Sequence, residues 1–216
     1  MEEINAVFTF IRHGATAGNL EKRYIGKKTD ESLCEIGAAE IAQNAAEGKY
    51  PGADFVFSSP MKRCLETCSL IYDSEKNPGL KPTIIEDFCE TDFGDFEGKN
   101  FSELKDNPEY KKWLESGGAL AFPDGESRAE AAARSLNGFS KMLEFLALKA
   151  EAGKRENMEK VEENLRVSAV VHGGTVMAVL SKLTGKNYYD FQIENGGKIS
   201  FRLKFSGGKM EAESLP

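Results

Sequence analysis

The 216-residue sequence lacks any long hydrophobic run. No window approaches the roughly 20 apolar residues that a membrane-crossing helix requires, so no spanning segment is expected. The first residues, Met1-Glu2-Glu3, are acidic where a secretory signal peptide is basic, and the apolar run from Ala6 to Ile11 is too short for such a signal. We therefore expect a cytoplasmic protein with no membrane partner.

The sequence also has few cysteines and no excess of positive charge. The four cysteines (Cys34, Cys64, Cys68 and Cys89) match neither a secreted disulfide framework nor a paired zinc motif, and we assign them no chemistry. With 28 Lys and Arg against 35 Asp and Glu, the formal charge is −7, which disfavours nucleic acid and anionic lipid as partners. An anionic ligand would need a local basic pocket. The length and the ordinary Gly and Pro content predict one domain, residues 1–216.

Apolar strand patterns alternate with helical patterns along the chain, which predicts a parallel-rich α/β sandwich. In this fold class, ligands bind beyond the carboxyl ends of the strands. A polar insertion at approximately 92–125 is expected to form a cap over the sheet. The expected strands cover residues 5–11, 54–57, 81–86, 166–171, 199–205 and 209–213, and the expected helices cover 35–48, 60–72, 101–116, 127–150 and 175–183.

Local signals predict where two of these helices begin. Ser32 lies three residues before Glu35 and resembles a capping box, while Ser58-Ser59-Pro60 places hydroxyl groups and a first-turn proline at the start of the next helix. The charged segment 151–164 is expected to be a solvated helix end or loop.

The only two histidines occur in the same setting. His13 follows the first expected strand and His172 the fourth, and each directly precedes a glycine. A lone histidine is usually structural, but two at the strand ends where α/β sites assemble indicate function. Zinc is disfavoured as their ligand, because two histidines without a clear further ligand set fall short of the three or four that zinc takes.

Two arginines are expected to join these histidines. Arg12 adjoins His13, and Arg63 lies in the first turns of a helix that begins at the same sheet edge. Guanidinium groups present planar donors that match phosphate oxygens, so the group predicts a small anion-selective pocket. From Arg12 to Lys28, counting both ends, there are five Lys or Arg residues and one acid, Glu21. This run either rims the pocket or is a solvated basic loop.

Five ordered blocks carry these residues and span residues 8 to about 205. They are Arg12-His13-Gly14-Ala15-Thr16-Ala17-Gly18-Asn19, Ser58-Ser59-Pro60-Met61-Lys62-Arg63-Cys64-Leu65-Glu66-Thr67, the acid-bearing segment from Glu90 to Gly98, Gly125-Glu126-Ser127, and His172-Gly173-Gly174. Together they resemble the signatures of the histidine phosphatase superfamily, in the branch that includes cofactor-dependent phosphoglycerate mutases. The resemblance implies a three-layer α/β/α sandwich with a mostly parallel mixed sheet and a small helical cap.

The resemblance also implies a reaction through a phosphohistidine that needs no metal and no cofactor. His13 would attack phosphorus as a neutral imidazole. Glu90 would give a proton to the leaving alkoxide and then take one from the attacking water. Three nearby acids, Glu86, Asp87 and Asp92, are alternative proton donors.

The remaining site residues are assigned to phosphate by the same resemblance. Arg12, Arg63 and His172 would hold the non-bridging oxygens and offset their charge. Gly173 would complete this binding set. Asn19 would either donate a hydrogen bond to phosphate or position the loop.

Some positions depart from the family pattern. Ala15 stands where glutamate is frequent, which changes loop contacts, and Cys89 stands where a basic residue is frequent, which alters the surroundings of the acid. Neither change removes a catalytic group. Trp113, on an expected cap helix, is expected to pack in a core rather than to stack on a base.

The sequence favours a phosphatase within the family. Only 32 residues separate Glu90 from Pro123, and this short cap resembles that of a phosphatase rather than a mutase. The loop Arg23-Tyr24-Ile25-Gly26 is similar to that of alpha-ribazole phosphatases, which implies a small phosphorylated metabolite, such as alpha-ribazole 5′-phosphate, as substrate. A phosphoglycerate mutase and a non-catalytic phosphate-binding regulatory domain are the alternatives. The sequence leaves open whether the chain forms a homodimer.

Overall fold

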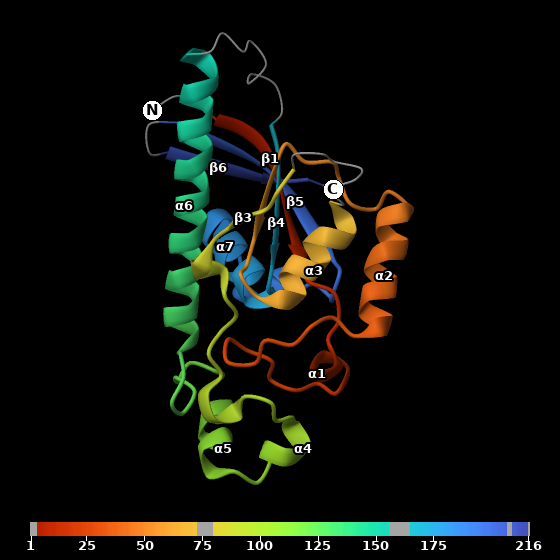
Figure 1. Ribbon diagram of the computed structural model, residues 1–216. Coiled ribbons are helices and arrows are strands. Elements are labelled where there is room, and N and C mark those ends of the chain that lie inside the picture. The colour runs from red at the N-terminus through yellow and green to blue at the C-terminus, as the bar shows by residue number, and fades with distance from the viewer. Residues whose placement is uncertain (1–3, 73–79, 156–164, 207–208, 216) are drawn as a thin grey trace.

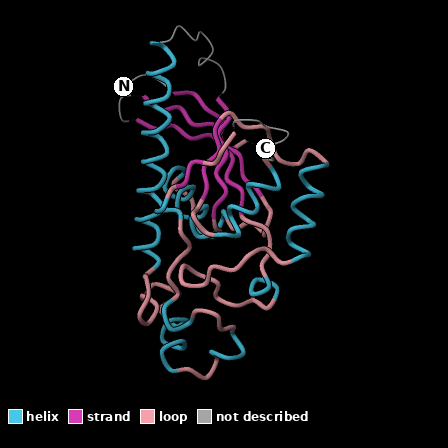
Figure 2. The backbone as a smooth tube through the Cα atoms, in the orientation of Figure 1, coloured by secondary structure: helices cyan, strands magenta, loops and turns pink. Residues whose placement is uncertain are grey.

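A single six-stranded sheet with helices on both faces organises the chain (Figure 1, Figure 2). The computed structural model describes residues 4–72, 80–155, 165–206 and 209–215. The strands are β1 (Ile4–Arg12), β2 (Phe55–Ser58), β3 (Thr83–Ile84), β4 (Leu165–Val171), β5 (Lys198–Ser206) and β6 (Lys209–Ser214). The helices are α1 (Ala17–Leu20), α2 (Glu35–Ala46), α3 (Lys62–Ile71), α4 (Phe101–Leu104), α5 (Pro108–Glu115), α6 (Arg128–Arg155) and α7 (Gly173–Thr184), with short 3-10 turns η1 (Glu86–Phe88), η2 (Gly94–Phe96) and η3 (Tyr188–Phe191). No helix in these described ranges is long and apolar enough to cross a membrane.

The sheet order is β3-β2-β4-β1-β5-β6. Strand β4 pairs in parallel with β1 and β2, β2 pairs in parallel with β3, and β5 runs antiparallel to β1 and β6. This arrangement confirms the predicted mostly parallel mixed sheet. Because Val171 pairs with Arg12 and Val170 with Ser58, the three parallel strands β1, β4 and β2 end at one edge. Three polar residues follow them there: His13, Ser59 and His172.

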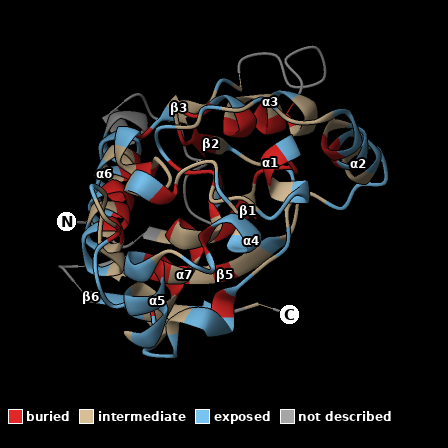
Figure 3. Cartoon of the chain, turned by 90° about the horizontal axis from the view of Figure 1, so that it is seen from below, coloured by how far each residue is buried: buried red, intermediate tan, exposed pale blue. Residues whose placement is uncertain are grey.

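Two different cores cover the two faces of the sheet. Phe8 and Phe10 stack on Phe201 at ring-centroid distances of 5.5 and 5.6 Å, and α6 and α7 close this face. Each buried ring contributes about 1.5–3 kcal/mol to folding through the hydrophobic effect. On the opposite face, Cys64 and Cys68 of α3 pack against the sheet as free buried thiols. Figure 3 shows the buried segments on the inner sides of α3 and α6.

The helix starts differ from the predicted ones. The helix expected from residue 60 begins at Lys62, because the Ser59 backbone continues β2 by donating to the Val170 carbonyl and its hydroxyl bonds His172. Cys34, not Ser32, caps α2: its Sγ accepts the Gly37 N–H at 3.4 Å. The final major helix, α7, starts at Gly173, two residues earlier than expected.

Two further predictions were too long. The strand expected over 81–86 contains only Thr83–Ile84, because η1 begins at Glu86. The helix expected over 101–116 is divided into α4 and α5. Pro108 has no backbone N–H to continue a helix, and it instead occupies the first turn of α5 behind the cap Asn107. The charged segment 151–164 begins inside α6, and its part 156–164 lies outside the described residues.

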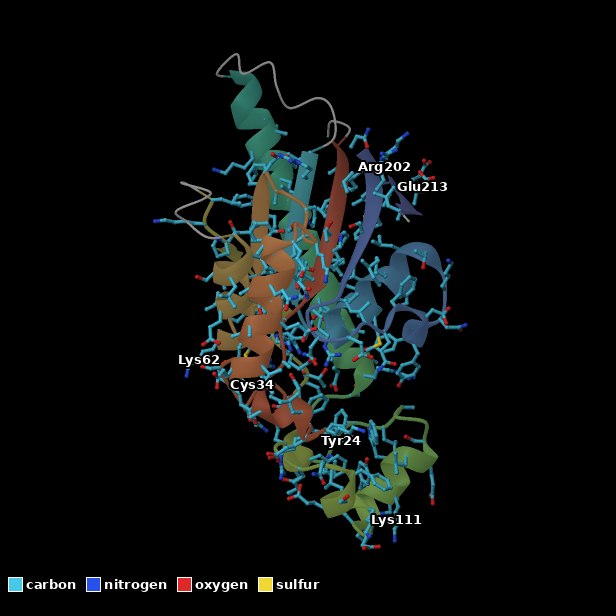
Figure 4. All side chains as sticks on the ribbon, turned by 90° about the vertical axis from the view of Figure 1, so that its right-hand side faces the viewer. Tyr24, Cys34, Lys62, Lys111, Arg202 and Glu213 are labelled. Carbon is cyan, nitrogen blue, oxygen red and sulfur yellow. The ribbon has the colours of Figure 1, made fainter. Side chains whose placement is uncertain are left out.

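Helices α4 and α5 form a cap beyond the carboxyl edge of the sheet, at the bottom of Figure 1. Its core is aromatic, with Phe96, Tyr110 and Phe122 buried. Trp113 stacks on Phe122 at 4.8 Å and on Tyr110 at 6.0 Å, so its ring packs in this core as expected. Figure 4 shows Tyr24 between the sheet layers and the cap, where its ring contacts this aromatic cluster.

Candidate active site

The two histidines meet at the carboxyl edge of the sheet. Their ring centroids lie 5.1 Å apart at an interplanar angle of 65°. The backbone N–H of His13 donates to the Val171 carbonyl at 3.0 Å. This bond extends the β1–β4 ladder and fixes the position of His13 relative to His172. His13 is 3% exposed and His172 is fully buried.

Hydrogen bonding leaves one nitrogen of His13 available for nucleophilic attack. Nδ1 lies 2.7 Å from the Gly14 carbonyl oxygen, which only accepts, so Nδ1 carries the proton and Nε2 keeps its lone pair. Burial, followed by the charges of Arg63 and Arg12, lowers the pKa of His13 to about 3. The imidazole is therefore neutral at physiological pH. Gly14 has no room for a side chain, because a Cβ would stand 2.7 Å from Ile41.

His172 offers a buried donor. Its Nε2 lies 2.8 Å from the Ser59 hydroxyl, which also accepts the Met61 N–H. We therefore assign the Ser59 hydroxyl as donor to Nε2, which places the ring proton on Nδ1. Burial, followed by the charges of Arg63 and His13, holds the pKa of His172 well below its usual range. Nδ1 has no hydrogen-bond partner in the described part of the chain.

The two arginines carry further donors of the same kind. Arg63 is fully buried and donates to the carbonyls of Thr29, Ile25 and Gly26, while Arg12 donates to the Ile193 carbonyl at 2.8 Å. The Nε atoms of both arginines are buried and have no hydrogen-bond partner among the residues that the structure describes. Leaving a buried charged donor unpaired is costly. Two such charged donors, Arg12 Nε and Arg63 Nε, act on His13 together with the neutral donor His172 Nδ1, and this group indicates a site for an anion.

Glu90 is the acid that reaches this group. Its Oε2 lies 3.8 Å from His172 Nδ1, and its Oε1 accepts the Thr91 N–H at 2.8 Å. Two of the alternative acids are held elsewhere, because Asp87 pairs with Lys141 at 2.6 Å and Asp92 pairs with Lys28 at 3.1 Å. Glu86, the third, is exposed at the start of η1.

Arg134 of α6 holds the segment that carries Glu90, a role that the sequence analysis missed. It donates to the carbonyls of Asp87, Cys89 and Glu90 at 2.9, 2.7 and 3.1 Å. It also forms a two-pronged pair with Glu126 at 2.7 and 2.8 Å. The Gly125-Glu126-Ser127 block therefore acts through Arg134 on the position of the acid.

We expect Arg134→Met to lower the free energy of unfolding by roughly 2–4 kcal/mol, because three carbonyls and the Glu126 carboxylate lose their donor. It should also slow hydrolysis of alkyl phosphates more than that of p-nitrophenyl phosphate, whose leaving group needs less help from Glu90. Urea denaturation and kcat on both esters test this. Arg166→Met is the matched control, because Arg166 forms a similar but exposed pair with Asp54 at the other end of β4. This substitution should lower the free energy of unfolding by only about 0–1 kcal/mol. Equal effects of the two substitutions would contradict the role of Arg134.

Asn195, also missed by the sequence analysis, links two parts of the site. Its Nδ2 donates to the His13 carbonyl at 3.1 Å and to Asn19 Oδ1 at 3.2 Å. Asn19 Oδ1 also accepts the Thr16 N–H at 3.2 Å, so this oxygen positions the loop. The Asn19 backbone N–H donates to Thr16 Oγ1 at 3.2 Å, whereas the side-chain Nδ2 donates no hydrogen bond among the described residues and remains available to a ligand.

The first two residues of α7, Gly173 and Gly174, lie next to Arg12 and Glu90. A Cβ on Gly173 would stand 3.7 Å from Arg12 Nε, and one on Gly174 would stand 3.1 Å from Glu90 Oε1. A Cβ at Gly173 is therefore in ordinary contact, whereas one at Gly174 would press on the Glu90 carboxylate.

A pocket of about 330 Å³ opens next to Arg12. It combines charged, amide and aromatic groups from the α1 loop and from the loop before β5. Its lining residues are Arg12, Asn19, Lys22, Arg23, Tyr24, Glu194 and Asn195. Part of the basic run from Arg12 to Lys28 therefore rims a pocket. Among the described residues, no group of three or more His, Cys, Asp or Glu side chains could hold a metal ion.

Comparison with known proteins gives one consistent family. The profile of the histidine phosphatase superfamily (branch 1) matches residues 8–215. A 2,3-bisphosphoglycerate-dependent phosphoglycerate mutase from Methylorubrum extorquens is 28% identical over 201 residues, 89% of this chain and 87% of the relative. A protein from Hydrogenobacter thermophilus, provisionally named phosphoserine phosphatase 2, is 27% identical over 199 residues, 90% of this chain and 88% of that protein. The alpha-ribazole phosphatase of Shigella flexneri has the same fold, with a TM-score of 0.75 and 21% identity over 97% of this chain and 95% of that one.

Proposed function

The chain belongs to the histidine phosphatase superfamily (branch 1), and from this membership we propose that it hydrolyses small phosphomonoesters through a phosphohistidine, without a metal ion. The relatives named above are phosphatases or phosphoglycerate mutases. The observation that carries the proposal is a group of three buried donors next to the neutral imidazole of His13. These donors, Arg12 Nε, Arg63 Nε and His172 Nδ1, have no partner in the described ranges of the chain. A phosphoryl group supplies acceptors for all three.

The first step transfers the phosphoryl group to the enzyme. The lone pair of His13 Nε2 attacks phosphorus, a P–N bond forms and the ester P–O bond breaks. Arg12, Arg63 and His172 hold the non-bridging oxygens and stabilise the charge that shifts in the transition state. Glu90 gives its proton to the departing alkoxide, so the product leaves as an alcohol.

The second step releases phosphate. Water attacks phosphorus while the Glu90 carboxylate takes its proton. The P–N bond breaks, and its electron pair returns to His13 Nε2. The enzyme is then ready for another substrate, with Glu90 protonated again.

Hydrolysis, rather than transfer to a second alcohol, is favoured by the pocket next to Arg12 and by the short cap. A mutase keeps its phosphoenzyme away from water until the acceptor is bound. Here the pocket next to Arg12 has a volume of about 330 Å³ and a polar lining, so it has room for several water molecules. The short cap, 32 residues between Glu90 and Pro123, supports the same assignment.

Phosphate release in the presence of EDTA tests the proposal. The panel contains p-nitrophenyl phosphate, 3-phosphoglycerate and alpha-ribazole 5′-phosphate, the substrate to which the similarity of the Arg23-Tyr24-Ile25-Gly26 loop points. We expect release from p-nitrophenyl phosphate to be unaffected by EDTA. Exchange between 2- and 3-phosphoglycerate without net phosphate release would instead assign a mutase. Tight phosphate binding without turnover would assign a regulatory domain.

A further inference from the structure

The orientation of the buried Arg63 guanidinium depends on one short loop, residues 25–29. Nη1 of this arginine donates to the Thr29 carbonyl at 3.0 Å. Nη2 donates to the Ile25 and Gly26 carbonyls at 3.4 and 3.3 Å. Because the loop engages both Nη groups, Nε is the guanidinium nitrogen that has no hydrogen-bond partner in the described part of the chain. The loop therefore determines which edge of Arg63 is open to an anion.

A carboxylate, that of Glu97, holds the same loop by its donors. Glu97 directly follows η2, before the cap helix α4. Its Oε2 accepts the Gly26 N–H at 3.0 Å and the Thr29 hydroxyl at 2.6 Å, and its Oε1 accepts the Lys28 N–H at 3.2 Å. The loop therefore gives its donors to Glu97 and its carbonyl oxygens to Arg63.

Two connections run from the carboxylate of Glu97 to the guanidinium of Arg63. The peptide group between Ile25 and Gly26 donates its N–H to the carboxylate and accepts the guanidinium with its C=O. Thr29 donates its hydroxyl to the carboxylate and accepts the guanidinium with its backbone carbonyl. Hydrogen bonds in such a chain polarise one another, so a negative charge at one end and a positive charge at the other strengthen each link. Arg63, which is fully buried, is therefore stabilised by a charge that it does not touch.

The loop is also tied to the segment that carries the acid. Lys27 donates its N–H to the Thr91 carbonyl at 3.1 Å, one residue after Glu90. At Gly26 there is no space for a side chain, because a Cβ would collide with Glu97 Oε1 and with the Thr91 carbonyl oxygen. Loss of the Glu97 carboxylate therefore has two routes to the chemistry, one through Arg63 and one through Glu90. The number of links favours the route through Arg63.

We propose that Glu97 is a positioning residue for phosphoryl transfer, which acts through residues 25–29 to hold Arg63 with its Nε toward the phosphoryl group. This inference rests on the proposed phosphatase function and adds a residue to the site. Charge on the transferring group is stabilised best by donors that are already oriented before the reaction. Without Glu97, the loop would lose three anchors and the guanidinium would no longer be held in one orientation.

Two substitutions of Glu97 test the role by kinetics. Glu97→Leu removes every acceptor, and we expect kcat to fall about 10- to 100-fold, because a small displacement of a positioned group is that costly. The loss should be equal for p-nitrophenyl phosphate and for an alkyl phosphate, since Arg63 acts on the phosphoryl group and not on the leaving group. Glu97→Gln keeps one acceptor oxygen and should recover most of the activity. A larger loss for the alkyl phosphate would assign the effect to Glu90 and overturn the proposal.

Glu66→Leu is the matched control. Glu66 of α3 accepts the Leu33 N–H at 2.7 Å, so its carboxylate also holds the chain that follows the loop, but beyond the three carbonyls that bind Arg63. This variant should leave kcat unchanged, while urea denaturation reports the loss of stability in both variants. Equal losses of kcat in Glu66→Leu and Glu97→Leu would show that the loop needs only general support, which contradicts the proposal.

A double-mutant cycle shows whether Glu97 acts through Arg63. In an Arg63→Met background, Glu97→Leu should cause no further loss of kcat, because no guanidinium remains to be positioned. In an Asn19→Ala background, it should cause its full loss. Losses that add fully with Arg63→Met would mean that the two residues act independently, and the proposal would be wrong.

An NMR measurement separates the role of Glu97 from the phosphatase activity itself. The Nε–H of a rigid, buried arginine gives a slowly exchanging proton–nitrogen signal, and the Arg63→Met variant identifies it. We expect the signal in the wild type and in Glu66→Leu, and its loss in Glu97→Leu. A signal that persists in Glu97→Leu, or its absence from the wild type, overturns the positioning role and leaves the phosphatase intact. If the signal depends on Glu97 but the folded wild type hydrolyses no ester, the phosphatase fails and Glu97 still positions Arg63.

Discussion

The His13→Ala variant is expected to release phosphate from p-nitrophenyl phosphate slower than the wild type by on the order of 10⁴-fold or more, because it removes the atom that forms the P–N bond. No other nitrogen can replace it. His172, the only other histidine, faces Ser59 with Nε2 and carries its proton on the side of Glu90. The guanidinium groups of Arg12 and Arg63 only donate hydrogen bonds and offer no nucleophilic lone pair.

Trapping of the intermediate distinguishes loss of the nucleophile from a general loss of structure. A phosphohistidine is stable to base and labile to acid, so wild type quenched in base after mixing with radiolabelled substrate should retain label that acid removes. The His13→Ala variant should carry none. Circular dichroism and urea denaturation check that the variant is folded. Undiminished turnover, or label that persists in the variant, would show that a different group is the nucleophile.

The position of the histidines could be predicted because it depends on a local signal. An apolar strand followed directly by Arg12-His13-Gly14 places the imidazole at the carboxyl end of that strand, and the same holds for His172. Parallel pairing then brings the two ends together, as the register of Arg12 with Val171 shows. The fold class followed from the same alternation of strands and helices.

The groups that position the proposed catalytic residues could not be predicted in this way. Arg134 lies on α6 among many charged residues, and nothing near it in the sequence marks its contact with the Cys89 and Glu90 carbonyls. Asn195 is 182 residues from His13, whose carbonyl it binds. Such contacts depend on how distant segments pack, so periodicity and spacing contain no signal for them.

The errors at element ends have a similar origin. Ser59 has the residue type of a helix cap, but the sheet uses its backbone and His172 uses its hydroxyl. Contacts with β4 and His172 therefore outweighed the local preference of Ser59 for a helix cap. The break at Pro108 could have been predicted, because a proline preceded by asparagine indicates a helix start. This proline divides the helix that apolar spacing alone would continue.

Glu90→Gln is expected to produce a defect that depends on the leaving group. An alkoxide needs a proton to leave, so kcat for an alkyl phosphate should fall by about 10²- to 10⁴-fold. The p-nitrophenolate ion leaves without a proton, so transfer of the phosphoryl group to His13 should remain fast with that ester. Glu86→Gln, at an exposed acid four residues earlier, is the control and should leave both rates unchanged.

Pre-steady-state kinetics make the prediction sharper, because the proposed mechanism gives Glu90 a different role in each half of the reaction. With p-nitrophenyl phosphate, Glu90→Gln should release about one equivalent of p-nitrophenol per site in a burst and then turn over slowly, since the attacking water still lacks its base. With an alkyl phosphate, no burst should occur, because the first step is itself slow. A burst with both esters would mean that Glu90 acts only as the base, and no burst with either would mean that it acts on the phosphoryl group. Equal steady-state losses alone would not separate these cases, so the burst is the measurement that assigns the proton to Glu90.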